Sequence, residues 1–520
     1  MSDSLDDLFA RYGPAYRWLA TVTVLIAFFT MALSATIANV AVPDVMGAFG
    51  VGQDKAQFVA TAFFATMTAS QLLITWFNER LGQRLTFSLA LLIFAGGSAI
   101  SGFGPTLEFI IAGRIFQGFS AGILQSLVML LLIQIFPPER RGLAMGLFSM
   151  GIVVALGVGP FVGGLAIDNM SWRYIFLVPM PLALLAFVMG WLFIPSSRSR
   201  ARVTRFDALG YALLCTALFC LMTAVANGQR DGWHSNGILA LFTVTIAASG
   251  GFILSQFRPN AGLLDMTLFR NARFVSAVAV ASVFGMGNFA TIYVFPVFGQ
   301  LVQEYTATLA GFLILPGSLV AAAILPLSGR LSDRHPPQYL IIFGLGLFSL
   351  SMFMMAGTDI DTRVWTVVIF IFIGRLGLAL VVPSMNGAAL GSLPPGKLTE
   401  GTGALNFFLL LGGAFGVNTL VVIMEQRTQF HSDLLAATQT AGNATTREML
   451  DSVQGLLGAA GVPRSMHNSV ALDYLGKVVH AQANTMGFQD GFVAIGLVFL
   501  VAMIPATILG WTLRRANKLN

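Results

Sequence analysis

The chain has 520 residues, of which 56% are hydrophobic and only 10% are charged, and its net charge is +6. A soluble domain carries about one quarter charged residues, because its surface faces water. The shortage of charge excludes a water-soluble protein and predicts a surface that mostly faces lipid. The positive charge sits in short loops between apolar runs, so no nucleic-acid partner is expected.

The apolar runs predict membrane-spanning helices. About 20 mostly apolar residues are needed to cross the hydrocarbon core of a bilayer. The first run, Trp18 to Ala41, is too long for the apolar part of a cleavable signal peptide, and we interpret it as a retained span. We expect 14 spans, near residues 18–42, 56–77, 86–103, 107–136, 143–167, 174–194, 207–226, 238–257, 274–301, 308–328, 339–356, 364–390, 403–424 and 490–513.

The distribution of basic residues predicts the orientation of the spans. With 14 spans both termini lie on the same side, and 19 of the 29 Lys and Arg residues fall on that side. Lys and Arg are enriched in cytoplasmic loops. We therefore predict a multi-pass protein of a bacterial cytoplasmic (inner) membrane with both termini in the cytoplasm.

Four pairs of short motifs recur in the same order at nearly constant spacing. Glu79-Arg80 and Asp333-Arg334 are 254 residues apart, Gly113-Arg114 and Gly374-Arg375 are 261 apart, and two Pro-Pro loops and two glycine-rich spans follow. This repeat predicts an N-terminal six-helix bundle over 1–200, two inserted helices over 201–260, and a C-terminal six-helix bundle over 261–520. Repeated bundles around a midplane site are typical of alternating-access carriers.

The motifs also resemble a known family. Arg114-x-x-Gln117-Gly118, Gly157-x-Gly159-Pro160-x-x-Gly163-Gly164 and Trp172-Arg173-Tyr174 are similar to signatures of the 14-span drug:proton antiporter branch of the major facilitator superfamily. The resemblance extends over essentially the whole chain. It implies an all-α major facilitator fold and proton-coupled multidrug efflux, without a cofactor, a bound metal or enzymatic activity.

Two departures from the family pattern concern the site. Ser34 stands where the first-span signature has an acid, and Leu409 stands where an arginine is common. No Asp, Glu or His lies at the middle of a predicted span, so the residue that would couple transport to protons is not visible. Asp44, Glu425 and Asp490 lie at span borders.

Polar residues inside spans identify a candidate substrate and coupling cavity. A charge deep in a span is costly unless it faces water or a partner. Arg114 and Arg375 are interpreted as cavity residues, and the alternative is that each is a structural arginine bonded to helix carbonyls. The predicted cavity residues are Asn39, Arg114, Gln117, Gln125, Asn288, Arg375 and Asn406. Two deep arginines without a midspan acid favour lipophilic acids or neutral phenolics over lipophilic cations as substrates.

Two further groups of residues are candidates for conformational change. The fifth predicted span is a candidate gating helix, because its glycines allow close packing and its proline lacks an N–H. The gating residues are Gly157, Gly159, Pro160, Gly163 and Gly164. Charged residues at cytoplasmic span ends are candidate latches, or alternatively solvated loop charges: Glu79, Arg80, Arg84, Arg140, Arg141, Asp333 and Arg334.

The segment 425–489 is the one long aqueous segment that we expect, on the periplasmic side. Apolar residues recur there at spacings of 3–4, which predicts an amphipathic helical hairpin. It is either a self-packed cap or a docking surface for a periplasmic adaptor and an outer-membrane channel, as the resemblance implies. We expect an exporter of lipophilic compounds; an importer of an organic anion and a non-transporting receptor are the alternatives.

Overall fold

The computed structural model describes residues 5–137, 141–196, 206–257, 263–394, 397–440 and 442–517. Every regular element in these ranges is a helix. This is what a bilayer requires of an open chain, since a helix satisfies its own backbone polar groups where no water is available. The prediction of an all-α polytopic membrane protein is confirmed.

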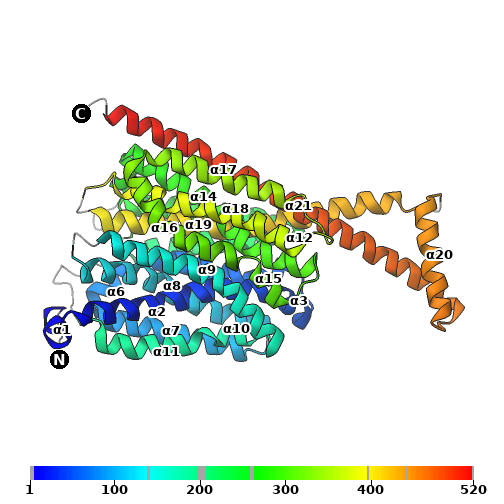
Figure 1. Ribbon diagram of the computed structural model, residues 1–520, viewed down its shortest axis with the longest axis horizontal. Coiled ribbons are helices and arrows are strands. Elements are labelled where there is room, and N and C mark those ends of the chain that lie inside the picture. Colours follow the sequence, from blue (N-terminus) through cyan, green and yellow to red (C-terminus); the bar gives the residue numbers. More distant parts are fainter. Residues whose placement is uncertain are drawn as a thin grey trace.

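The helices form two groups and an inserted pair (Figure 1). We call α2 to α11 the N half and α14 to α21 the C half. The N half and its leading helix are α1 (Leu5–Tyr12), α2 (Ala15–Ile37), η1 (Ala38–Ala41), α3 (Val42–Phe49), α4 (Gln53–Ala56), α5 (Phe58–Gln71), α6 (Ile74–Leu81), α7 (Gln83–Phe103), α8 (Leu107–Ile135), α9 (Arg141–Asn169), α10 (Tyr174–Leu177) and α11 (Pro179–Phe193). The inserted pair is α12 (Ala208–Asp231) and α13 (Asn236–Gln256). The C half, with its leading 3₁₀ turn, comprises η3 (Met266–Arg270), α14 (Ala272–Leu301), α15 (Ala307–Phe312), α16 (Leu315–Arg334), α17 (Pro337–Met355), α18 (Val364–Leu390), α19 (Leu398–Thr438), α20 (Ala444–Ala459) and α21 (Arg464–Asn517).

Within the described ranges, 13 helices are long and apolar enough to cross a membrane. The predicted span near 56–77 is the one missing from this set, because a turn at Leu72 and Leu73 divides it into α5 and α6. The 14 residues of α5 rise about 21 Å, which is less than the hydrocarbon thickness. The second crossing is therefore a broken helix rather than a continuous one.

The same kind of helix contact occurs in both halves. In the N half the Ser101 hydroxyl donates to the carbonyl of Ile110 at 3.0 Å, beside Gly113. In the C half the Ser351 hydroxyl donates to the carbonyl of Phe370 at 2.6 Å, beside Gly374. The glycines let α7 approach α8, and α17 approach α18, closely enough for these bonds, as is typical of membrane helix pairs.

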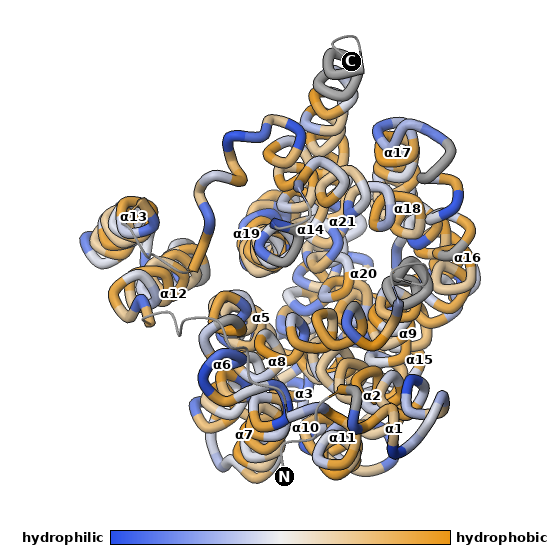
Figure 2. The backbone as a smooth tube through the Cα atoms, turned by 90° about the vertical axis from the view of Figure 1, so that its left-hand side faces the viewer, coloured by the Kyte–Doolittle hydropathy of each residue, from blue (hydrophilic) through white to orange (hydrophobic). Residues whose placement is uncertain are grey.

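The inserted pair α12 and α13 lies beside the bundle rather than inside it (Figure 2). Helix α12 packs against α5 of the N half and α19 of the C half. Asn418 of α19 joins the three parts: its amide donates to the Met222 sulfur of α12 at 3.2 Å, and its oxygen accepts from the Thr61 hydroxyl of α5 at 3.4 Å. The pair therefore covers one seam between the halves.

The segment 425–489 is helical, but it differs from the two-helix hairpin expected from the sequence. Helix α19 continues from the membrane to Thr438, α20 follows, and α21 begins at Arg464 and returns through the membrane. No Pro or Gly interrupts α19 between Glu425 and Thr438, so the span and its extension form one helix. These extensions and α20 project from the bundle, opposite the end where both termini lie (Figure 1). We call the two ends of the molecule the projecting end and the termini end.

Candidate functional site

A cavity of about 150 Å³ lies at the centre of the molecule, between the two halves. Its walls come from α2, α5, α8 and α9 on one side and from α14, α18 and α19 on the other. Most of the lining is phenylalanine, methionine and aliphatic side chains. Among the described residues that line it there is no Asp, Glu, His, Lys or Arg. The volume is small beside the several hundred Å³ of most ligand pockets, so the cavity is narrow in this conformation.

Four amide side chains provide most of the polarity of the cavity wall: Gln125 of α8, Asn288 of α14, Asn386 of α18 and Asn406 of α19. Three of them were predicted from the sequence, and Asn386 was not. Asn386 also lies inside an apolar span, so the same argument from buried polarity could have found it.

Arg114 does not line this cavity. It is fully buried in the N half, where its Nε donates to the Val59 carbonyl at 2.8 Å. Its Nη1 donates to the carbonyl and hydroxyl of Ser34, both at 3.0 Å, and to Gln117 Oε1 at 2.8 Å. The guanidinium also lies 4.2 Å from the centre of the Phe63 ring, in a cation–π contact. Arg114 thus joins α2 and α5 to α8.

Two other predicted cavity residues also lie inside the N half. Gln117 accepts from Arg114 and donates to the Ser98 hydroxyl at 2.8 Å. Asn39, in η1, is 1% exposed, and its Oδ1 has no hydrogen-bond partner within the described structure. Neither lines the central cavity.

Arg375 lies directly behind the cavity wall. It is 1% exposed, and its Nη1 donates to Asn288 Oδ1 at 3.5 Å. Its Nε and Nη2 have no hydrogen-bond partner among the residues that the structure describes. Gly317 of α16 makes room for the side chain, since a Cβ there would lie 3.0 Å from the Arg375 Cγ.

The cavity is closed toward the projecting end. There Gln300 Nε2 of α14 donates to the Val40 carbonyl at 2.7 Å, and the Thr308 backbone N–H donates to Asp168 Oδ2 at 2.8 Å. Gln53 and Tyr293 form a further bond between the halves at 3.3 Å. These bonds join the halves where α2 and α14 end and where α15 begins.

The glycines of α9 pack this closed seam. A Cβ on Gly157 would overlap Ser318 of α16, and a Cβ on Gly164 would overlap the backbone of Ala307. Gly159 and Gly163 face α2 instead, at Thr36 and Ile37. The helix continues through Pro160, whose carbonyl lies against Gly311 of α15. The predicted gating residues therefore lie on α9 at its contacts with both halves.

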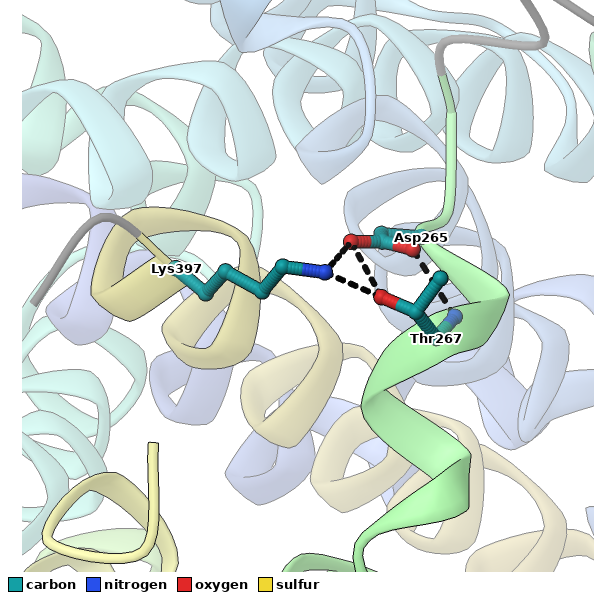
Figure 3. A network of polar contacts seen from close by, with 3 residues as sticks. All are labelled: Asp265, Thr267 and Lys397. Atoms are coloured by element: carbon teal, nitrogen blue, oxygen red, sulfur yellow. Dashed lines mark hydrogen bonds and ion pairs between the residues drawn. The ribbon is translucent and has the colours of Figure 1, made fainter. Parts of the chain in front are cut away.

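A second, more polar cleft of about 870 Å³ opens between the halves at the termini end. It lies between Gln71, Ile74 and Glu79 of the N half and the segment from Leu263 to Arg270 with the start of α19. At its rim the Lys397 amine donates to Asp265 Oδ2 at 2.8 Å and also contacts the Thr267 hydroxyl (Figure 3). This network ties η3 to the start of α19.

The predicted latch residues lie at the termini end. Glu79 lines the cleft, Arg80 lies 5.4 Å from the Trp76 ring, and Arg84 Nε donates to the Ile194 carbonyl at the end of α11 at 2.7 Å. Arg140 lies outside the described residues, and so do the side chains of Arg141, Asp333 and Arg334.

A cavity lies between two groups of membrane-spanning helices, hydrogen bonds join the groups at one end, and a cleft opens between them at the other. This arrangement is typical of a membrane transporter. The model of one family, the Major Facilitator Superfamily, matches residues 24–417. The chain belongs to this superfamily, which confirms the resemblance seen in the sequence.

Several relatives are named for the export of drugs or for resistance to toxic compounds. The chain is 27% identical over 444 residues to the multidrug export protein EmrB of *Escherichia coli* K12, covering 84% of this chain and 86% of the relative. It is 26% identical to the lincomycin resistance protein LmrB of *Listeria innocua*, covering 77% and 85%. It is 25% identical to the fatty acid resistance protein FarB of *Neisseria gonorrhoeae*, covering 95% and 96%.

Solved structures share the fold at lower identity. An auto-inhibited peptide transporter of the POT family superposes with a TM-score of 0.61 at 14% identity, covering 95% of this chain and 97% of the other. A bacterial homologue of the lysosomal transporter Spinster, in an inward-facing conformation, gives a TM-score of 0.59 at 14% identity, covering 96% and 98%.

Proposed function

We propose that the protein is a secondary-active exporter of lipophilic compounds that works by alternating access. The central cavity carries this proposal: it lies between the halves, its walls are mostly apolar, and it is closed at the projecting end while a cleft opens at the termini end. Apolar walls with a few placed polar groups suit lipophilic ligands. The relative named as a multidrug export protein supports the direction of transport.

The orientation is part of the proposal. The excess of Lys and Arg at the termini end assigns that end to the cytoplasm of a bacterial inner membrane. The cleft then faces the cytoplasm, and the cavity is in the state in which an exporter takes up its substrate from the cytoplasm or the inner leaflet. The sequence units 1–200, 201–260 and 261–520 would act as the N half, the inserted pair and the C half.

Opening toward the projecting end would separate α9 from α15 and α16. The close contacts at Gly157 and Gly164 would part, and the bond between Asp168 and the Thr308 N–H would break. At the termini end, the predicted latch residues from Glu79 to Arg84, with their counterparts near Asp333, would then close the cleft. Arg114, within the N half, would move with that half as one body.

Coupling to protons is proposed from the resemblance of the sequence motifs to the drug:proton antiporter branch. The central cavity presents no acid among its described lining residues, so we place the titrating groups at the borders of the spans. Asp168 is exposed at the projecting end and accepts a bond across the seam, which makes it a candidate beside Asp44, Glu425 and Asp490.

The projecting helices are proposed to meet a periplasmic adaptor that leads to an outer-membrane channel. Large apolar side chains are exposed on them, including Phe430 at 52% and Leu456 at 70%. An exposed apolar surface outside the membrane is typical of a contact site.

The direction of transport can be tested in membrane vesicles of known orientation. A deletion strain is first profiled against anionic, neutral and cationic lipophilic toxicants, and the compounds that it no longer tolerates are then used in vesicles. An exporter accumulates them in inside-out vesicles when a proton gradient is imposed. Accumulation in right-side-out vesicles would support the importer, and no movement in either would contradict the transporter.

The gating role of α9 can be tested with two glycine substitutions on the same helix. Gly164→Ala should block closure at the projecting end by overlap with Ala307, and it should slow transport. Gly151→Ala is the matched control, because its Cβ would make ordinary contacts of 3.8 Å with Leu25 and Phe28. Equal transport by both variants would contradict the role of this seam.

A further inference from the structure

Asn288 is held in one orientation by the arginine behind it. Arg375 Nη1 lies 3.5 Å from Asn288 Oδ1. A guanidinium can only donate, so the amide oxygen must turn toward it. The Nδ2 group of Asn288, which can only donate, is then left for the cavity, whose wall Asn288 forms.

Gln125 on the opposite wall also accepts a hydrogen bond from a side chain behind it, which here is a neutral amide. Gln71 Nε2 of α5 donates to Gln125 Oε1 at 2.9 Å, which leaves the Nε2 group of Gln125 for the cavity. Gln71 is 1% exposed and borders the cleft at the termini end. Sequence reasoning did not select Gln71, because its role depends on the neighbour that it contacts.

Arg375 adds positive charge behind the C-half amide. It has one long hydrogen bond, and two of its nitrogens have no partner in the described part of the chain. No carboxylate among the described residues forms an ion pair with it. A buried cation without a counter-charge projects a strong field through its apolar surroundings. The field polarises Asn288 toward accepting partners in the cavity.

We infer that the central cavity selects lipophilic molecules whose polar group is a hydrogen-bond acceptor, such as a carboxylate, and that Asn288 and Gln125 donate to that group. This inference rests on the proposed function and names its substrate class. A polar group that only donates, such as a primary ammonium, would face two N–H groups and a buried cation when it lies between Asn288 and Gln125. The N–H groups of such a ligand would then face the N–H groups of Asn288 and Gln125 without an acceptor between them, which lowers the affinity.

The test uses 4-phenylbutyrate and 4-phenylbutylammonium, which share an apolar body and differ in the polar group. Binding of each is measured to the purified full-length protein in lipid nanodiscs. The wild-type protein should bind the carboxylate about 10- to 100-fold more tightly, the range expected for a hydrogen bond to a charged group. Equal binding, a preference for the ammonium, or binding of neither overturns the inference.

Variants separate recognition from a structural role. Asn288→Leu should lower the affinity for phenylbutyrate about tenfold and leave that for phenylbutylammonium unchanged or higher. Asn288→Asp, which places acceptors where donors stood, should reverse the preference. Gln125→Leu on the opposite half provides a second, independent site. If both affinities fall by the same factor in Asn288→Leu and in Gln125→Leu, the side chains are structural and the inference is wrong.

The inference and the proposed function fail in different ways. If inside-out vesicles accumulate lipophilic compounds but the protein does not prefer phenylbutyrate, only the inferred substrate class is wrong. If no compound moves in vesicles of either orientation, the proposed function itself is wrong, whatever the binding experiment shows.

Discussion

Arg114 and Arg375 occupy matching places in the two halves and have very different surroundings. Each follows a glycine that packs against a serine of the preceding span, at Ser101 and Ser351. Arg114 donates to a carbonyl of α5, to both oxygens of Ser34, and to Gln117, and it lies over Phe63. Arg375 has one bond of 3.5 Å, to Asn288.

The difference shows that a repeat fixes the depth of a residue but not its role. Arg114 fits the alternative of a structural arginine, because four hydrogen bonds from its Nε and Nη1 hold three helices together, while its Nη2 has no partner among the described residues. Arg375 lacks such a set of bonds, and the one side chain to which it bonds lines the cavity. Of the two, the C-half arginine is better placed to influence a substrate.

The comparison is tested most strongly by Arg114→Leu. We expect the free energy of unfolding to fall by about 3 kcal/mol, because at least three buried acceptors lose their donor. Thermal denaturation of the purified protein in detergent measures the loss. A variant as stable as the wild type, with only transport impaired, would show that Arg114 acts on substrate or protons instead.

A smaller loss is expected for Gln117→Leu, which removes one acceptor of Arg114 and the bond to Ser98. The expected destabilisation is about 1–2 kcal/mol. The same denaturation assay applies, with Ser120→Ala as the control, because its hydroxyl bonds to the carbonyl of Phe116 on its own helix. A loss no greater than that of the control would mean that Gln117 is not part of a stabilising network.

Arg375→Leu should change the free energy of unfolding by about 1 kcal/mol or less. Replacement of a poorly bonded buried charge by an apolar side chain is often neutral or stabilising. If Arg375→Leu proves as destabilising as Arg114→Leu, the contrast between the halves is wrong. The two variants are therefore measured side by side, in the same detergent and at the same pH.

The smallest change in the free energy of unfolding is expected for the ion pair of Asp265 and Lys397, which lies outside the spans. It provides a baseline for the two buried arginines. Partial burial raises the pKa of Asp265, but hydrogen bonds from Lys397 and Thr267 and the lysine charge outweigh it and lower the pKa from 3.8 to about 2. The pair thus stabilises the fold above pH 3.8, and this contribution is lost as the pH falls through about 2.

Asp265→Asn should accordingly cost about 0.5 kcal/mol or less at neutral pH, since both side chains are partly exposed. The difference from the wild type should vanish toward pH 2, as followed by denaturation at several pH values. A difference that persists there would show that the carboxylate charge is not its source.

Hydropathy was sufficient to predict 13 of the 14 expected spans, which are helices long and apolar enough to cross a membrane in the described ranges. The broken second crossing escaped prediction, because the turn at Leu72 and Leu73 contains neither Gly nor Pro. The extensions of α19 and α21 were predicted as a separate hairpin. The apolar stretch of each helix ends at the membrane boundary, although the helix itself continues beyond it.

The site was predictable as a set of polar residues inside spans, but not as an arrangement. Gln125, Asn288 and Asn406 reach the cavity wall, while Arg114 and Gln117 do not. The composition of a span does not show which of its side chains contact a neighbouring helix, as Arg114 contacts the Val59 carbonyl of α5. Only the three-dimensional packing distinguishes Arg114, with four hydrogen bonds, from Arg375, with one.

Helix α19 links the centre of the molecule to its far tip. It carries Asn406 on the cavity wall and continues without a break to Thr438, 41 residues in all. The 32 residues that follow Asn406, up to Thr438, extend about 48 Å, so a tilt of about 10° at the cavity would displace the tip by about 8 Å. Because the helix is continuous, a change of its tilt at the cavity would move the tip that lies outside the membrane.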